Sequence, residues 1–148
     1  MTSTVRPLPT DDGAQHRTHH GPVERRLLIG LHGLVAANAL YGGIGLMVNG
    51  MGMPKEWLKH LPVDSWTLPG VALLTTVMVP QALGAAAQIR DDDRADRFTL
   101  VTGLALVAWI AVQLAVLRRY FFLQPVIAAF GVAEAAMSAM RLRRRRSA

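Results

Sequence analysis

The sequence predicts an all-α fold, an integral membrane four-helix bundle with a short interfacial helix in its first outer loop. Three stretches of the 148 residues contain no Asp, Glu, Lys or Arg: Leu27–Val48, Thr67–Ile89 and Phe98–Leu117. A fourth stretch, Tyr120–Met140, contains a single charged residue, Glu134. Each stretch is about 20 residues or longer, which at about 1.5 Å per residue is enough to cross a hydrocarbon core of about 30 Å.

Composition divides the chain into three parts. Residues 1–24 are polar and contain three Pro, which predicts a disordered arm on the cytoplasmic side. Residues 25–142 form the membrane domain, with spans at about 26–49, 67–89, 98–117 and 123–142, and residues 143–148 form a basic cytoplasmic tail. The chain has no Cys, which excludes disulfides and thiol redox chemistry.

The loop after the first span carries a helical signal of its own. Within residues 54–62, the side chains of Trp57, Leu58 and Leu61 can share one face, which predicts a short helix lying in the membrane interface. Trp57 and Trp66 are typical of the aromatic belts found at that depth.

Capping residues and prolines set the later spans. Asp64 or Ser65 can cap the second span, and Pro69 fits its first turn. Pro80 lies inside the same span and should kink it. Pro125 marks the first turn of the fourth span.

The distribution of basic residues predicts the orientation. If the N-terminus lies inside, the inner side holds twelve of the sixteen Lys and Arg: Arg6, Arg17, Arg25, Arg26, Arg90, Arg94, Arg97, Arg141 and Arg143 to Arg146. The outer side holds the other four, Lys55, Lys59, Arg118 and Arg119. This bias predicts that both termini are cytoplasmic. The Ala-, Val- and Arg-rich composition indicates a bacterium, and therefore its inner (cell) membrane.

The cluster of arginines at the C-terminal end predicts a lipid partner. Besides the bilayer itself, we expect anionic lipid to bind the tail from Arg141 to Arg146, because each basic residue near the surface attracts it by about 1 kcal/mol. A nucleic-acid partner is not predicted, since the run is short and has no aromatic residues interleaved.

Glu134 is the residue most indicative of a function. A carboxylate in hydrocarbon costs several kcal/mol unless it is paired, hydrated or protonated. Because none of the four apolar stretches contains a Lys or Arg that could pair with it, we expect Glu134 to be uncharged and hydrogen-bonded. Arg141 is two turns away, and we expect its side chain to extend to the inner surface. A structural role is the alternative, because a protonated Glu can join two helices.

Each of the other spans also carries a polar or amphipathic residue near its centre. We predict that these residues face inward and surround Glu134 in one polar layer, and the candidates are Asn38, Gln81, Trp109 and Gln113. The alternative is that two or three of them only stabilise helix packing. His32 lies near the inner surface in this interpretation, about a third of a turn from the face of Asn38.

The remaining signals indicate packing and argue against bound groups. Small residues at Gly131, Ala135 and Ala139 are spaced by four, which is typical of close helix packing or of a face that binds a membrane-protein partner or a second copy. No second His shares a span with His32, so the sequence predicts no metal site and no cofactor. Neither a catalytic triad nor a nucleotide-binding motif is present.

One region resembles a known group of proteins. It comprises Gly42–Met47, Gly52–Pro54, Trp57–Leu58 and Leu68–Leu74, with weaker similarity at Gln124–Pro125 and Gly131. This pattern is similar to that of small uncharacterised bacterial membrane proteins loosely related to the DoxX-like group. The resemblance implies a four-helix fold and, for most such proteins, no assigned activity. Some DoxX relatives are linked to quinone or thiol redox systems, but this chain has no Cys for the thiol chemistry.

Two functional hypotheses follow. The first is a non-enzymatic subunit or accessory factor of the membrane, and the second is a small transporter or ligand-binding protein that uses Glu134 as a proton or cation site. An enzyme is a third class, which no motif supports. A sealed helix contact around Glu134 favours the first hypothesis, and a cavity reaching water favours the second.

Overall fold

The protein is an all-helical membrane bundle, as the sequence predicts. The computed structural model describes residues 22–59, 62–118, 120 and 122–147. Four helical spans in this part of the chain are long and apolar enough to cross a membrane. They are α1 (Pro22–Asn49), the continuous helix formed by α2 (Thr67–Leu73), η3 (Leu74–Met78) and α3 (Val79–Ile89), then α4 (Ala95–Leu117) and α5 (Leu123–Ser147).

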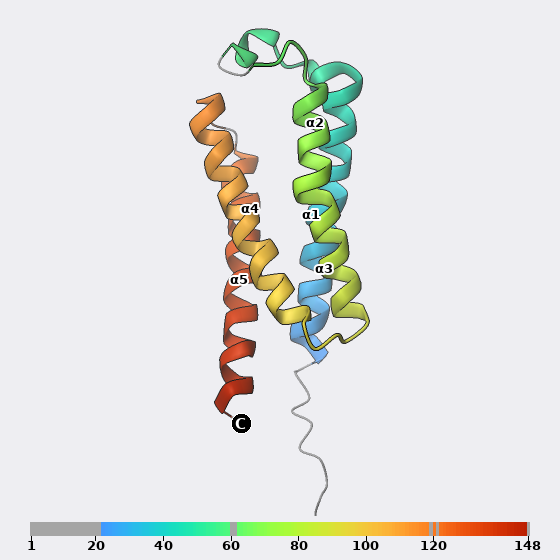
Figure 1. Cartoon of the computed structure of the whole chain (residues 1–148), viewed down its shortest axis with the longest axis vertical. Helices are drawn as coiled ribbons and strands as arrows, with labels where there is room; N and C mark the ends of the chain where they lie inside the picture. Colours follow the sequence, from blue (N-terminus) through green and yellow to red (C-terminus); the bar gives the residue numbers. More distant parts are fainter. Residues whose placement is uncertain (1–21, 60–61, 119, 121, 148) are drawn as a thin grey trace, which may run out of the picture.

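The spans form two helical hairpins that meet at one end only (Figure 1). The first hairpin is α1 with α2–η3–α3, and the second is α4 with α5. The hairpins contact each other where α3 meets α4 and α1 meets α5, and they diverge toward the opposite end. We call the joined end the arginine end, after Arg25, Arg94, Arg141 and Arg145, and the other end the loop end, after residues 50–59 and 62–66.

Glycines allow the helices within each hairpin to approach closely. A Cβ atom at Gly103 of α4 would lie 2.7 Å from the carbonyl oxygen of Gly131 on α5, and a Cβ atom at Gly131 would lie 2.8 Å from that of Gly103. In the first hairpin, a Cβ atom at Gly70 would lie 2.7 Å from the carbonyl oxygen of Gly43. Backbones this close gain van der Waals contact that larger residues would prevent.

The second span passes Pro80 by widening one turn. The five residues of η3 form a π-helical turn directly before it, in which the Val79 N–H donates to the Leu74 carbonyl, five residues back. Pro80 has no N–H and its ring would clash with the carbonyl four residues earlier in a regular α-helix. The wider turn relieves that clash, and the Thr76 hydroxyl donates to the Ala72 carbonyl at 2.6 Å.

The loop end contains two short 3₁₀ turns, η1 (Gly50–Gly52) and η2 (Lys55–Leu58). The second turn occupies the segment predicted as an interfacial helix, and its Leu58 is buried. Trp66 is also buried, and its Nε1 donates to the Met53 carbonyl at 3.3 Å. It therefore packs within the loop end and does not face lipid as a belt residue would.

Three helix ends lie outside the ranges that the sequence predicts. α1 begins at Pro22 and α4 at Ala95, and α5 continues to Ser147 through the segment predicted as a tail. The first turn of α4 and the end of α5 are joined by ion pairs of the buried Asp96 with Arg141 and Arg145. An exposed pair joins Glu24 of α1 to Arg144. Arginine also favours helix. The predicted arm is described only from residue 22, so its residues 1–21 lie outside the described part of the chain.

Candidate functional site

Three polar side chains from three helices meet where the hairpins join. They are His32 of α1, Gln81 of α3 and Glu134 of α5. Gln81 Nε2 donates to Glu134 Oε2 at 3.0 Å, and Gln81 Oε1 accepts a hydrogen bond from His32 Nδ1. His32 Nδ1 also lies 3.4 Å from Glu134 Oε1. We call these three residues the His–Gln–Glu site.

The fourth helix contributes Thr99 of α4, whose Oγ1 lies 3.0 Å from His32 Nε2. The same Oγ1 accepts from Gln88 Nε2 at 3.0 Å. Since the Thr99 oxygen already accepts from Gln88, its hydroxyl hydrogen is available for His32 Nε2. This arrangement fits a neutral imidazole that donates through Nδ1 and accepts through Nε2.

The site is closed to solvent and lipid. His32, Thr99 and Glu134 are each 0% exposed, and Gln81 is 1% exposed. Gly84, one turn after Gln81, provides the space for the imidazole, because a Cβ atom there would lie 2.6 Å from His32 Cε1. α3 therefore approaches the His32 ring of α1 this closely because residue 84 lacks a side chain.

The His–Gln–Glu site is chemically an acid beside a base. A neutral imidazole with a protonated carboxyl group, or an imidazolium with a carboxylate, leaves the site without net charge. Both arrangements avoid the large cost of an isolated charge inside a membrane protein. Glu134 Oε1 has no hydrogen-bond partner among the described residues, and it lies 3.4 Å from His32 Nδ1. Because Nδ1 already carries a hydrogen in the tautomer described above, a second proton enters the imidazole at Nε2, beside Thr99.

A second buried polar cluster connects this site to the arginine end. Asp96 is 0% exposed and pairs with Arg141 Nη1 at 3.1 Å and with Arg145 Nη2 at 3.1 Å. Gln88 joins the two clusters, because its Oε1 accepts from Arg141 at 3.3 Å while its Nε2 donates to Thr99. A continuous series of buried side chains therefore runs from Glu134 to the arginine end.

The expectation that Arg141 extends to the membrane surface is wrong. Its side chain is 3% exposed and lies inside the bundle against Asp96. The reason is that α4 begins before Asp96, so that this carboxylate lies within the bundle, where it needs a buried counter-charge.

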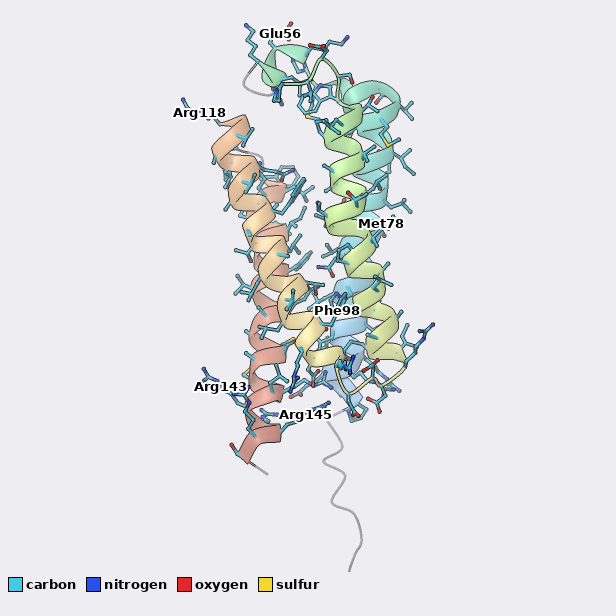
Figure 2. The ribbon with its side chains drawn as sticks, in the orientation of Figure 1. Glu56, Met78, Phe98, Arg118, Arg143 and Arg145 are labelled. Atoms are coloured by element: carbon cyan, nitrogen blue, oxygen red, sulfur yellow. The ribbon has the colours of Figure 1, made fainter. Side chains whose placement is uncertain are left out.

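The arginine tail is only partly free to meet lipid. Arg144 pairs with Glu24 at 3.2 Å, and Arg145 points toward the first hairpin, whereas Arg143 points away from it (Figure 2). Arg143 and Arg146 are exposed and make no ion pair with the described residues. The prediction of anionic lipid therefore applies to these two arginines more than to the whole cluster.

The predicted polar layer separates into two places. Glu134 and Gln81 are in direct contact, but Asn38, Trp109 and Gln113 line a cavity nearer the loop end. Asn38 is six residues beyond His32, which is about 9 Å along the helix axis. Depth explains the separation, because residues that share a helix face can still lie more than one turn apart.

Sequence reasoning missed His32, Thr99 and Asp96. It placed His32 near the surface because the first span was expected to begin at residue 25 or 26, whereas the helix begins at Pro22, about 15 Å before His32. The presence of His32 inside the charge-free stretch Leu27–Val48 could have indicated that its side chain is buried among the helices. No signal marked Asp96, which stands in a run of charged residues.

Among the described residues, no group of three or more His, Asp or Glu side chains could hold a metal ion. No protein-family model matches this chain, and no curated protein or solved structure matches it. The resemblance to DoxX-like proteins therefore stays a prediction, and the functional argument depends on the site alone.

Proposed function

We propose that this protein is a small proton-coupled transporter or ligand-binding protein of the membrane, in which His32 and Glu134 take up and release a proton. The observation that carries the proposal is the pairing of an acid and a base, both 0% exposed, where the two hairpins meet. An ionisable residue inside a membrane span is a functional-site hypothesis by default. The site is sealed, which by the criterion given for Glu134 alone favours an accessory subunit. That criterion took no account of a buried base beside the acid, and this pairing is our reason for proposing proton exchange.

A site that only holds helices together would not need two ionisable residues. One hydrogen bond between two neutral side chains, such as Gln81 and a second amide, is enough to join two helices. Here Gln81 bonds both ionisable residues and orients them toward each other. Adding or removing one proton gives the site a net charge, so the bundle must compensate by a conformational change or by binding a second charge. That requirement is the physical basis for coupling.

The route of the proton leads to the arginine end. Thr99 contacts His32, Gln88 contacts Thr99, and Asp96 lies 3.5 Å from Gln88. The Thr99 hydroxyl can both donate and accept, whereas the Gln88 amide cannot take up one proton and release another. We therefore propose that water entering from the arginine end carries the proton past Gln88 to Thr99. In the orientation that we propose from the arginine count, this end faces the cytoplasm of a bacterium.

Infrared difference spectroscopy of the reconstituted protein, titrated with pH, tests the proposal. We expect a carboxyl carbonyl band that changes with pH in the wild type and in Glu56→Gln but is absent from Glu134→Gln. Glu56 is a matched control because it is exposed at the loop end. Identical spectra for wild type and Glu134→Gln, over the pH range where both stay folded, would refute proton exchange at this site.

A structural role in an accessory subunit is the second candidate. It is favoured by the sealed contact around Glu134, whose Cβ lies 3.1 Å from where a Cβ atom at Gly103 would be. In that case Glu134→Gln, which keeps an acceptor oxygen for Gln81, would preserve the function in cells. The same partner proteins would also co-purify with it in mild detergent. Proton coupling instead predicts loss of function with normal expression and folding.

A further inference from the structure

One buried hydroxyl group close to the His–Gln–Glu site makes no hydrogen bond. Ser138 of α5 is 0% exposed, and its Oγ has no hydrogen-bond partner among the described residues. A serine in a helix often donates to the carbonyl of the preceding turn, as Ser147 does to Arg143 at 3.2 Å. Ser138 does not, so its hydroxyl is a buried donor of the kind that native proteins rarely leave unpaired.

An unpaired acceptor lies one turn away on the same helix. Glu134 Oε1 has no hydrogen-bond partner in the described part of the chain, whereas Oε2 accepts from Gln81 Nε2. Ser138 is four residues after Glu134, and side chains four residues apart are neighbours on a helix surface. Helical side chains lean toward the N-terminus of their helix, so the Ser138 hydroxyl lies over the turn that carries Glu134. A change in the Glu134 rotamer can therefore bring the two groups into contact.

Beyond Ser138 the surroundings of α5 are positively charged. Arg141, three residues further along, is 3% exposed, and its Nε also has no hydrogen-bond partner among the described residues. Arg141 and Arg145 both pair with the single carboxylate of Asp96, so this cluster of two positive side chains and one negative one carries a net charge of +1. It attracts a carboxylate that moves one turn closer, because charges interact strongly in a low-dielectric interior.

We propose that the Glu134 side chain has two positions and that Ser138 is its hydrogen-bond donor in the second. The protonated carboxyl group lies against Gln81 and His32, as in the structure. The ionised group turns toward the arginine end, where its carboxylate accepts a hydrogen bond from the Ser138 hydroxyl. This inference rests on the proposed proton exchange, and it names a residue that holds one of the two states.

Neither position leaves an isolated charge in the membrane. The protonated group is uncharged beside the neutral imidazole and the Gln81 amide, and the carboxylate lies closer to Arg141. The charged or titratable side chains around the two positions come from three helices: His32 of α1, Asp96 of α4, and Arg141 and Arg145 of α5. The contacts from α3 are the amides of Gln81 and Gln88.

Infrared difference spectra of the full chain in phosphatidylcholine vesicles separate the two states. The protonated Glu134 gives a carbonyl band and the ionised Glu134 a carboxylate band, and each is assigned by its absence from Glu134→Gln. We expect Ser138→Ala to shift the carboxylate band and to leave the carbonyl band unchanged. A serine that only fills space between helices would change neither band.

Two further variants control for this effect. Thr102→Val also removes a buried hydroxyl, but one that donates to the Thr99 carbonyl at 3.1 Å, and it should shift neither band. Ser138→Cys keeps a weaker donor of similar size, so its carboxylate band should lie between those of wild type and Ser138→Ala. The cysteine variant also provides the same comparison if Ser138→Ala does not fold.

The outcomes distinguish this inference from the proposed function. A Glu134 carboxylate band at one frequency in wild type, Ser138→Ala and Ser138→Cys would overturn the role of Ser138 and leave proton exchange standing. An equal shift in Thr102→Val would overturn it as well, because the effect would not be specific to Ser138. If no carboxylate band of Glu134 forms at any pH at which the protein is folded, the proposed function fails and this inference fails with it.

Discussion

The position of His32 is determined by neighbours on three other helices. Gln81, Thr99 and Glu134 contact its two ring nitrogens, and the backbone of α3 at Gly84 lies against the ring. A ring held on both nitrogens has one orientation and, when neutral, one tautomer. The orientation of the imidazole therefore also depends on Gly84, whose side chain takes no part in hydrogen bonding but leaves room for the ring.

Replacing Gly84 with Ala should displace His32. The added Cβ would lie 2.6 Å from Cε1 and 2.9 Å from both ring nitrogens. We expect a loss of about 1–3 kcal/mol in the free energy of unfolding, as for overpacked cores, measured by denaturation in mixed micelles. Gly30→Ala is the control, because a Cβ atom there meets nothing within 4 Å. It should not destabilise, since Ala favours helix by up to about 1 kcal/mol over Gly. Equal effects of the two changes would contradict this account of Gly84.

At the scale of elements, the ends of helices at the arginine end are held by buried ion pairs. Asp96 in the first turn of α4 contacts Arg141 and Arg145, which lie one turn apart near the end of α5. An acidic residue is favourable at a helix N-terminus and a basic one at a C-terminus. Gln88 extends the same contact to α3, so this cluster joins the two hairpins.

Asp96→Asn should destabilise the bundle far more than Asp93→Asn. It leaves the buried Arg141 without its counter-charge, and such losses cost about 3–5 kcal/mol. The Asp93 side chain is exposed, so its replacement should change the free energy of unfolding by less than about 0.5 kcal/mol. The double variant Asp96→Asn with Arg141→Met should recover part of the loss. A double variant less stable than Asp96→Asn alone would show that Arg141 is not the penalised charge.

The spans could be predicted from the sequence because an apolar, charge-free stretch of this length is typical of a membrane-spanning helix. Glu134 and Gln81 could be predicted because each interrupts such a stretch. The depth of a side chain within the bundle could not be predicted. It depends on where a helix begins and ends, and the ion pairs of Asp96 with Arg141 and Arg145, which join the ends of α4 and α5, form only in the folded bundle. Because depth was predicted wrongly, the sequence analysis placed Asn38 beside Glu134, where the structure has His32. The same error led it to place the Arg141 side chain at the membrane surface.

At the scale of the whole molecule, two hairpins are joined at one end (Figure 1). The His–Gln–Glu site lies at the junction, and a cavity lies beyond it toward the loop end. The surroundings of the His–Gln–Glu site therefore differ between its arginine-end side and its loop-end side. Buried side chains connect Glu134 with the arginine end, whereas apolar residues separate it from the cavity.

We predict the orientation of this molecule in the cell from the distribution of its Lys and Arg residues. Cysteines introduced singly at Glu56 and Ser147 lie at opposite ends of the bundle. In intact cells we expect an impermeant maleimide to label residue 56 and not residue 147, because Lys and Arg are retained on the cytoplasmic side. Permeabilised cells serve as the control, and both positions should react there. The reverse pattern in intact cells would invert the proposed topology.

The measurement that tests the central claim most directly is the side from which the proton reaches Glu134. Protein is reconstituted in vesicles in one orientation, and the pH is changed rapidly on one side while the carboxyl band assigned by Glu134→Gln is followed. The account predicts that the band responds at once to pH at the arginine end and only after a delay to pH at the loop end. A prompt response to the loop end alone, or none to either end, would contradict it.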